Sequence, residues 1–206
     1  MISASLPLLL GSQSPRRKDI LESLRLPFSV LPADVAEHVE TGETPAGYIE
    51  RIVAAKLSAV ADKVRAAPRA LSAILVADTI VVLGSAILGK PSDVNDAERL
   101  LTELCGRTHR VITRYAVADR APFETATLSR SVTTEVTLRA ASREQIRRYA
   151  ASGEGLDKAG AYAAQGLGSF LVERVDGSYT NVVGLPAAEL IADLGALGLL
   201  GEYPLS

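Results

Sequence analysis

The sequence has little of what disulfides and zinc sites are made from. Among its 206 residues there is one cysteine, Cys105, and there are two histidines, His38 and His109. A single cysteine cannot close an internal disulfide, which fits a reducing compartment without requiring one. A zinc site built from His and Cys is nearly excluded, and we interpret Cys105 and His109 as structural residues. Any metal used would be a hard ion held by carboxylates and phosphate oxygens.

Aromatic residues and positive net charge are also scarce. Tryptophan is absent, aromatic residues make up 4% of the chain, and the formal net charge is -2 at pH 7. A protein that coats a nucleic acid is usually basic, and binding of single strands depends on aromatic stacking. We therefore predict no nucleic-acid partner. Small anions stay possible as ligands, because they need only a local cluster of cations.

The chain has no long apolar run free of charged residues. Its N-terminal segment contains the apolar run Leu8–Leu10, but no Lys or Arg precedes it, whereas a signal peptide begins with positive charge. The longest apolar stretch, residues 73–88, contains Asp78, which would be costly in a bilayer. This stretch therefore predicts strands. We expect no membrane span, no membrane partner and a cytoplasmic location.

Apolar residues, by contrast, are plentiful. They make up 48% of the chain, enough for one large domain or two closely joined lobes. We predict a single domain over residues 1–206. Periodicity and capping residues predict helices at 15–24, 45–60, 96–104, 142–153 and 186–197. Strands are predicted at 7–11, 28–31, 73–83, 86–88, 108–117, 131–138, 170–175 and 178–183.

Several of these neighbouring strands are joined by short turns. Gly84-Ser85 and Asp176-Gly177 both predict tight hairpin turns. Purely parallel sheets need long crossovers between strands. The sequence therefore predicts an α/β fold class with a mixed sheet.

The first candidate site is the segment Gly11-Ser12-Gln13-Ser14-Pro15-Arg16-Arg17. A strand ends, a loop of small residues follows, and a helix begins with Ser14 as its expected cap. Backbone N–H groups and the positive end of the helix then face one point, and two arginines add donors suited to phosphate. The alternative is an ordinary capped surface helix with solvated arginines.

The second candidate is the pair Asp78-Thr79, which interrupts a β-branched apolar strand. A carboxylate there is costly unless it is paired or binds a metal. The alternative is a structural, salt-bridged Asp78. Two lysines are weaker candidates: Lys90 in a Gly-Lys-Pro turn, and Lys56 on an apolar-rich stretch. Their alternatives are a solvated turn lysine and a lysine whose stem lies along apolar surface.

The third candidate is the segment 152–166, in which small residues, acids and a lysine occur without a clear period. Such loops bring backbone close to a ligand, and the alternative is a plain connection. Gly166-Leu167-Gly168 lacks the rest of a dinucleotide fingerprint. Several cations and one committed carboxylate suit phosphoryl chemistry with a divalent metal. No nucleophile elbow of a Ser-His-Asp hydrolase is present.

From about Leu8 to Leu194, the chain resembles the Maf family of nucleoside triphosphate pyrophosphatases in a series of short sequence motifs that occur in the same order. The matching words are Ser12-Gln13-Ser14-Pro15-Arg16-Arg17, Ala77-Asp78-Thr79-Ile80-Val81, Gly89-Lys90-Pro91, Gly106-Arg107-Thr108-His109-Arg110-Val111, Ser152-Gly153-Glu154, Asp157-Lys158-Ala159-Gly160, Gln165-Gly166 and Val182-Val183-Gly184-Leu185-Pro186. The resemblance implies a long twisted mixed sheet with helices on both sides and two lobes around a cleft, as in the inosine triphosphate pyrophosphatases. It also implies a homodimer.

The resemblance further implies hydrolysis of a nucleoside triphosphate to the monophosphate and pyrophosphate, with a divalent cation (Mg²⁺, Mn²⁺ or Co²⁺) bound at Asp78. It gives catalytic roles to residues of five segments, namely Ser12, Arg16, Arg17, Glu37, Lys56, Asp78 and Lys90. Glu37 is placed by looser spacing than the others. A nucleotide-pool cleaning role is one implied purpose.

One subgroup of the family, acting on dTTP and UTP, is similar to this chain at Arg16, Thr79 and Gln165. Arg114 and Ala163-Ala164 depart from the family pattern near the expected base site. Two alternatives therefore stay open. The substrate would be 7-methyl-GTP or another modified nucleotide, or the protein would be a non-catalytic nucleotide-binding regulator of cell division.

Overall fold

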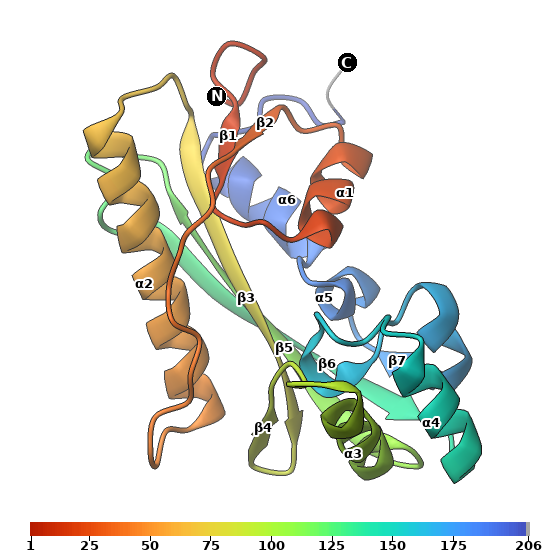
Figure 1. Ribbon diagram of the computed structural model, residues 1–206. Coiled ribbons are helices and arrows are strands. Elements are labelled where there is room, and N and C mark those ends of the chain that lie inside the picture. The colour runs from red at the N-terminus through yellow and green to blue at the C-terminus, as the bar shows by residue number, and fades with distance from the viewer. Residues whose placement is uncertain (205–206) are drawn as a thin grey trace. The chain divides into compact units, whose positions relative to one another are not determined.

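A computed structural model describes residues 1–204 and contains both helices and strands (Figure 1). The helices are α1 (Pro15–Ser23), α2 (Pro45–Ala66), α3 (Val94–Leu104), α4 (Arg143–Ala151), α5 (Tyr179–Val183) and α6 (Ala187–Ala196). The strands are β1 (Leu8–Leu10), β2 (Phe28–Val30), β3 (Ala73–Leu83), β4 (Ala86–Leu88), β5 (Thr108–Ala118), β6 (Leu128–Leu138) and β7 (Val172–Asp176). Two short 3₁₀ helices lie at Ala159–Ala161 and Gly166–Leu171.

The strands of the described residues form one seven-stranded sheet in the order β2-β1-β3-β5-β6-β7, and β4 pairs with β3 outside this order. Strand β1 is parallel to both β2 and β3, whereas β3–β4 and β6–β7 are antiparallel pairs. The predicted α/β class with a mixed sheet is confirmed.

The chain divides into two compact units. We call unit 1 the residues Met1–Asp78, Thr113–Ser131 and those from Gly184 onward, and unit 2 the residues Thr79–Ile112 and Val132–Val183. The single domain over 1–206 stays a prediction.

The core of unit 1 lies between α2 and the strands β1, β3 and β5. Thr44 caps α2 by accepting a hydrogen bond from the Gly47 N–H at 3.1 Å, and Pro45 occupies the first turn. Apolar residues then recur every three or four positions and make one face of the helix apolar. That face and the strands bury Leu9, Val53, Leu57, Val60, Ala61, Val64, Ile74, Val76, Ala116 and Ala118. Each large side chain buried here contributes roughly 1.5–3 kcal/mol, so β3 is held firmly where it reaches Asp78.

The core of unit 2 forms around α3 and α4. The predicted capping box of α4 is confirmed, because the Gln145 N–H donates to the Ser142 hydroxyl at 3.2 Å and the Ser142 N–H donates to the Gln145 side chain at 3.0 Å. Both helices direct apolar side chains to the same cluster, which contains Leu100, Leu101, Leu104, Val136, Leu138, Ile146, Tyr149, Tyr162 and Leu171.

The predicted strand over 178–183 is wrong, and with it the hairpin turn predicted at Asp176-Gly177, because Tyr179–Val183 form the short helix α5. The Ser178 hydroxyl accepts the N–H of Asn181 at 3.2 Å, a local bond that favours the start of a helix. The Thr134 hydroxyl accepts the Ser178 N–H and donates to its carbonyl, both at 3.1 Å. Asn181 donates its amide to the Val111 carbonyl at 3.1 Å. These polar contacts override the strand preference of the β-branched residues that follow.

His109 is buried in unit 2, which agrees with its interpretation as a structural residue. It is 2% exposed, its Nε2 lies 2.8 Å from the Tyr162 hydroxyl, and its Nδ1 has no hydrogen-bond partner among the described residues. Burial lowers the pKa of His109 from 6.5 to about 4. The imidazole is therefore neutral at physiological pH and packs edge-on against the Tyr162 ring.

We expect this buried imidazole to destabilise the protein in mild acid. In the unfolded chain the His109 imidazole binds a proton near pH 6.5, and in the folded chain only near pH 4. The free energy of unfolding is therefore not reduced by His109 above pH 6.5, and it falls as the pH drops toward 4. The full effect is up to about 3 kcal/mol. Urea unfolding at several pH values should show a shallower acid slope for His109→Phe and an unchanged slope for His38→Phe, whose histidine is exposed. A full slope in His109→Phe would assign the acid sensitivity to other groups.

Candidate functional site

The loop between β1 and α1 is organised by Ser12. Its buried hydroxyl accepts the Ser14 N–H at 3.2 Å and a guanidinium N–H of Arg17 at 3.0 Å. Ser14 occupies the N-cap position of α1 and Pro15 begins the helix, as predicted, but the Ser14 side chain makes no capping bond. The expected side-chain cap at Ser14 is therefore wrong, and the Ser12 hydroxyl accepts the N–H of Ser14 itself, before the helix begins. Because the Ser14 side chain makes no capping bond, the positive N-terminal end of α1 is of the kind that favours an anion.

Arg17 is a buried cation beside this loop. Besides Ser12, it donates its Nε–H to the Gly184 carbonyl at 2.9 Å, although 167 residues separate the two in sequence. Burial lowers the pKa of Arg17, the nearby carboxylates Asp78 and Glu37 raise it in part, and Arg16 lowers it further. Arg16 itself is half-buried. Both predicted arginines therefore belong to one electrostatic cluster with the two predicted acids.

The central finding in unit 1 is a lysine shared by two carboxylates. The Lys56 ammonium on α2 lies 2.7 Å from Asp78 Oδ1 on β3 and 2.6 Å from Glu37 Oε1. The side chains of Lys56 and Asp78 are 8% and 10% exposed, and that of Glu37 is 34% exposed. One positive and two negative charges leave this centre net negative. The Lys56 side chain is buried and paired with both acids, and the salt bridge given as the alternative interpretation of Asp78 is present.

A neighbouring phenol responds to the same negative charge. Tyr48, on α2, is 6% exposed and lies under the guanidinium of Arg51 at 5.6 Å from the ring centre. Burial first, and then the charges of Asp78 and Glu37, raise the pKa of Tyr48 to about 12. Tyr48 therefore stays protonated beside the acid pair.

The segment that carries Glu37, residues 31–43, runs along α2 (Figure 1). Lys63 donates to the Pro32 carbonyl and to Asp34, both at 2.7 Å, at one end of the segment. Arg51 holds the other end. It donates to the His38 carbonyl at 2.9 Å and to both Glu43 oxygens at 2.7 Å. Since α2 holds both flanks, Glu37 is held against Lys56.

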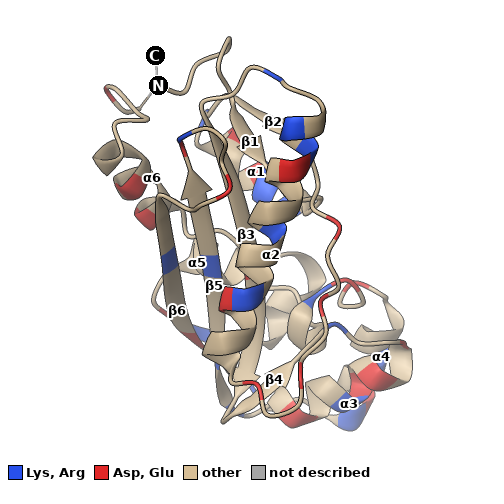
Figure 2. Cartoon of the chain, turned by 90° about the vertical axis from the view of Figure 1, so that its left-hand side faces the viewer, with Lys and Arg blue, Asp and Glu red and all other residues tan. Residues whose placement is uncertain are grey.

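Charge along this segment is consistent with that anchoring. Figure 2 shows acidic residues spaced along the connection beside α2, and basic residues on α1 and α2. The Arg51 side chain lowers the pKa of Glu43 to about 2 through its hydrogen bonds. The carboxylate of Glu43 is therefore ionised, and the anchor intact, over the whole physiological pH range.

The remaining predicted residues belong to unit 2, where they lie on three separate segments. Thr79 is the next residue of β3 after Asp78 and is half-buried. Lys90 is exposed in the turn after β4, and Gln165 is exposed at the N-cap of the second 3₁₀ helix. The Gly160 N–H donates to the Gly89 carbonyl at 3.1 Å, so the 152–166 loop is joined to the Gly-Lys-Pro turn. The roles of Thr79, Lys90 and Gln165 stay predictions.

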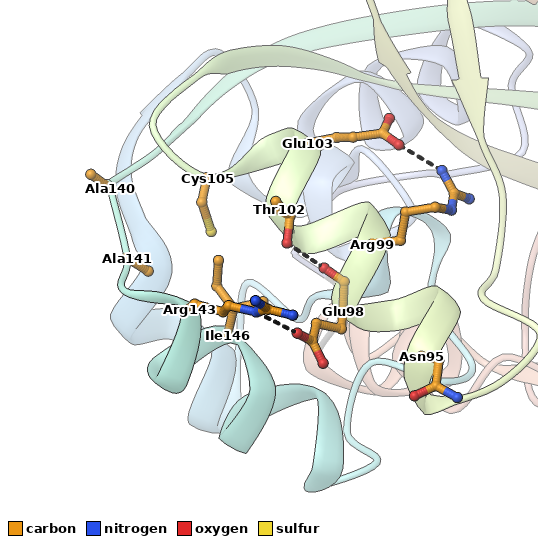
Figure 3. Close-up of a pocket in the computed structure, with 10 residues that line it drawn as sticks. All are labelled: Asn95, Glu98, Arg99, Thr102, Glu103, Cys105, Ala140, Ala141, Arg143 and Ile146. Atoms are coloured by element: carbon orange, nitrogen blue, oxygen red, sulfur yellow. Dashed lines mark hydrogen bonds and ion pairs between the residues drawn. The ribbon is translucent and has the colours of Figure 1, made fainter.

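A groove of about 750 Å³ lies elsewhere in unit 2, between α3 and the beginning of α4 (Figure 3). Its charged side chains pair with one another, Arg143 with Glu98 at 3.7 Å and Arg99 with Glu103 at 2.6 Å. Cys105 lines it, and burial raises the pKa of the Cys105 thiol, which makes the thiolate scarce. None of the residues predicted to carry chemistry lines this groove.

Sequence reasoning missed three contributors to the site. These are the Gly184 carbonyl, Arg51 and Tyr48. Gly184 does lie in one of the sequence motifs that match the family. Arg51 and Tyr48 lie on the same helix as Lys56, and a search for polar residues on the expected buried face of that helix would have found them. Gly184 gives no such local signal.

In residues 1–204, no cluster of three or more His, Cys, Asp or Glu side chains is arranged to hold a metal by itself. In the same residues, no helix is both long enough and apolar enough to span a membrane.

The fold and the site define a class: an α/β protein with an acid-lysine centre beside an arginine-serine loop at a helix N-terminus, suited to anionic ligands. A solved structure, that of a HAM1 protein from Coxiella burnetii, has a similar fold. It matches with a TM-score of 0.51 at 15% identity, over 94% of this chain and 98% of that one.

The family is shown by sequence. The model of the family described as "Maf-like protein" matches residues 7–197, and the chain belongs to this family. Curated relatives named "dTTP/UTP pyrophosphatase" include proteins of Myxococcus xanthus, 47% identical over 93% of each chain, and of Geobacter sulfurreducens, 45% identical over 94% of this chain and 97% of the other. A relative from Geobacter sp. (strain M21) is 41% identical over 95% of this chain and 97% of its own.

Proposed function

We propose that this protein hydrolyses nucleoside triphosphates to the monophosphate and pyrophosphate, with dTTP and UTP as the favoured substrates. The observation that carries the proposal is the centre in which the buried Lys56 joins the buried Asp78 and the more exposed Glu37. A binder of nucleotides has no need of two carboxylates gathered beside cations, whereas a phosphoanhydride hydrolase needs a base, such as a carboxylate, to receive the proton of the attacking water. The names of relatives 41–47% identical to this chain support the same activity.

The residues present fit a divalent cation shared with the substrate. Asp78 and Glu37 both approach one ammonium within 2.7 Å, so two carboxylates face one point. Mg²⁺, Mn²⁺ and Co²⁺ accept carboxylate ligands, and triphosphate oxygens complete the set. Asp78 is the proposed principal ligand and Glu37 the second. When bound, the cation would supply charge neutralisation on the phosphates.

In the proposed reaction, Asp78 orients a water molecule and accepts its proton. The water oxygen forms a bond to the α-phosphorus, the bond from that phosphorus to the bridging oxygen breaks, and pyrophosphate leaves with the bond electrons. The Ser12 hydroxyl and the N–H groups opening α1 hold phosphate oxygens. Arg16, Arg17, Lys56 and Lys90 neutralise the charge that develops on the departing pyrophosphate.

Base selection is assigned to Gln165, supported by Thr79 and Arg16. The imide edge of uracil and thymine presents one N–H donor flanked by carbonyl acceptors. A glutamine amide carries both an acceptor and a donor and so matches that edge. Gln165 is exposed in unit 2 and available to a ligand. Cytosine presents a different pattern and should be a poor substrate.

The finer properties rest on the sequence and stay predictions. They are a homodimeric state, no nucleic-acid partner, a cytoplasmic location and a role in cleaning the nucleotide pool. The alternatives are a preference for 7-methyl-GTP or another modified nucleotide, and a regulator of cell division without catalysis.

A substrate panel tests the proposal. With Mg²⁺ or Mn²⁺, we expect pyrophosphate release from UTP and dTTP with kcat/KM at least tenfold above that for CTP, ATP, GTP and 7-methyl-GTP. A preference for the methylated purine would keep the reaction and remove the roles given to Thr79 and Gln165. Release from none of these nucleotides would favour the regulator.

A further inference from the structure

The loop carrying Gln165 is held in place by two side chains of unit 2 that the proposed chemistry does not use. Glu154 accepts the Leu167 N–H on one oxygen at 2.9 Å and the Gly168 N–H on the other at 2.7 Å. The Tyr149 hydroxyl donates to the second Glu154 oxygen at 2.9 Å and accepts the Ala163 N–H at 3.0 Å. The backbone is thus bonded two residues before Gln165 and two and three residues after it.

The glycines around Gln165 are required by this arrangement. A Cβ on Gly166 would lie 2.4 Å from a Glu154 oxygen, and one on Gly168 would lie 2.3 Å from the Tyr149 hydroxyl. Gly166 also has φ +70°, a conformation that disfavours other residues. The segment Gly166-Leu167-Gly168 lacks the rest of a dinucleotide motif. Its glycines are explained by close packing on Glu154 and Tyr149.

The protonation states of Tyr149 and Glu154 suit these hydrogen bonds, in which the phenol donates to the carboxylate. Burial raises the pKa of Tyr149, and the bond to Glu154 raises it further, so the phenol keeps its proton and donates. Burial would raise the pKa of Glu154, but the Leu167 and Gly168 N–H groups and the Tyr149 hydroxyl together lower it. The carboxylate is therefore ionised and accepts all three bonds. The Tyr149 ring, 2% exposed, also packs edge-on against Phe170.

We propose that Glu154 and Tyr149 are positioning residues for base selection. They fix the backbone on both sides of Gln165, so that its amide meets the pyrimidine edge without a cost of ordering the loop. This inference rests on the proposed function, because it takes Gln165 as the residue that reads the base. Neither side chain needs to touch the substrate.

The test compares Glu154→Gln and Tyr149→Phe with the wild type in a selectivity assay. Each variant keeps the shape of the side chain and removes bonds to the loop. We expect kcat/KM for UTP to fall about tenfold or more, chiefly through KM, and kcat/KM for CTP to change less than twofold. Glu144→Gln, which removes a surface charge from α4 paired with Arg147 and Arg148, is the matched control and should keep the wild-type UTP/CTP ratio.

A double-mutant cycle with Gln165→Ala separates positioning from general structural damage. If Glu154 acts through Gln165, Glu154→Gln should cause little further loss of UTP selectivity in the Gln165→Ala background. A full additional loss there, or an unchanged UTP/CTP ratio in a folded Glu154→Gln variant, would overturn the inference. Equal losses of kcat/KM for UTP and CTP would likewise overturn it, because Glu154 would then act only on stability.

Equilibrium binding of UTP and CTP to the same variants distinguishes failure of the inference from failure of the proposed function. A wild type that prefers UTP in binding but releases no pyrophosphate would contradict the proposed reaction. The variants would then still test the inference through the ratio of dissociation constants. A wild type that distinguishes the two nucleotides neither in binding nor in turnover would overturn the inference and the proposed preference for UTP.

Discussion

Asp78→Asn should lower kcat/KM for pyrophosphate release from UTP by about 10²–10⁴-fold, the range of general-base catalysis. An amide at this position can still accept a hydrogen bond from Lys56 through its oxygen, but it cannot take a proton from water at neutral pH. It also removes one of the two carboxylates that meet at Lys56. The change is nearly isosteric, so the apolar strand β3 around it should stay packed.

The measurement is steady-state pyrophosphate release, with thermal unfolding of the same preparations. Asp34→Asn is the matched control. Asp34 is also paired with a lysine of α2, Lys63 at 2.7 Å, but its side chain is 76% exposed. The control should keep wild-type turnover. Turnover of Asp78→Asn within tenfold of the wild type would remove Asp78 from the proton transfer and leave it as a structural partner of Lys56.

Local chemistry explains why much of the fold could be predicted. Thr44 followed by Pro45 marks the start of α2, and Ser142 with Gln145 marks α4 through bonds that span three residues. Both partners of such a contact are close in sequence, so the contact forms wherever that stretch of backbone is helical. The 178–183 segment was predicted wrongly because the local Ser178–Asn181 bond acts together with a distant one: Thr134 binds Ser178 from 44 residues away.

The same distinction separates what was foreseen in the site from what was not. A polar Asp78 in an apolar strand signals a costly group that needs a partner, and the sequence shows that much. Which partner it has depends on the packing of α2 against β3, and Lys56 is 22 residues away in sequence. Glu37 was placed by resemblance, and its ion pair with Lys56 at 2.6 Å gives that placement a physical basis. Arg17 and Gly184 meet only in the folded chain.

Lys56→Met should impair both stability and activity. Removing the ammonium leaves two carboxylates facing each other without their shared cation, and loss of one partner of a buried ion pair costs about 3 kcal/mol or more. For a chain of this size that corresponds to a fall in Tm of roughly 6–12 °C. The added negative charge should also repel a triphosphate and lower kcat/KM for UTP by about 100-fold or more.

Lys63→Met is the exposed counterpart, because Lys63 lies on the same helix and pairs with an acid at the same distance of 2.7 Å, although it also loses the bond to the Pro32 carbonyl. The Lys63 and Asp34 side chains are 38% and 76% exposed, so the loss should stay below about 1 kcal/mol. Excess Mg²⁺ without nucleotide should raise the Tm of Lys56→Met more than that of the wild type, since the uncovered carboxylates then bind the cation and stabilise the fold. If Lys56→Met were as stable and active as Lys63→Met, the Lys56 ion pairs would have no energetic role. If the Tm of Lys56→Met fell but did not rise with Mg²⁺, the Lys56 ion pairs would still be stabilising. The proposal that Asp78 and Glu37 jointly bind the metal would then be contradicted.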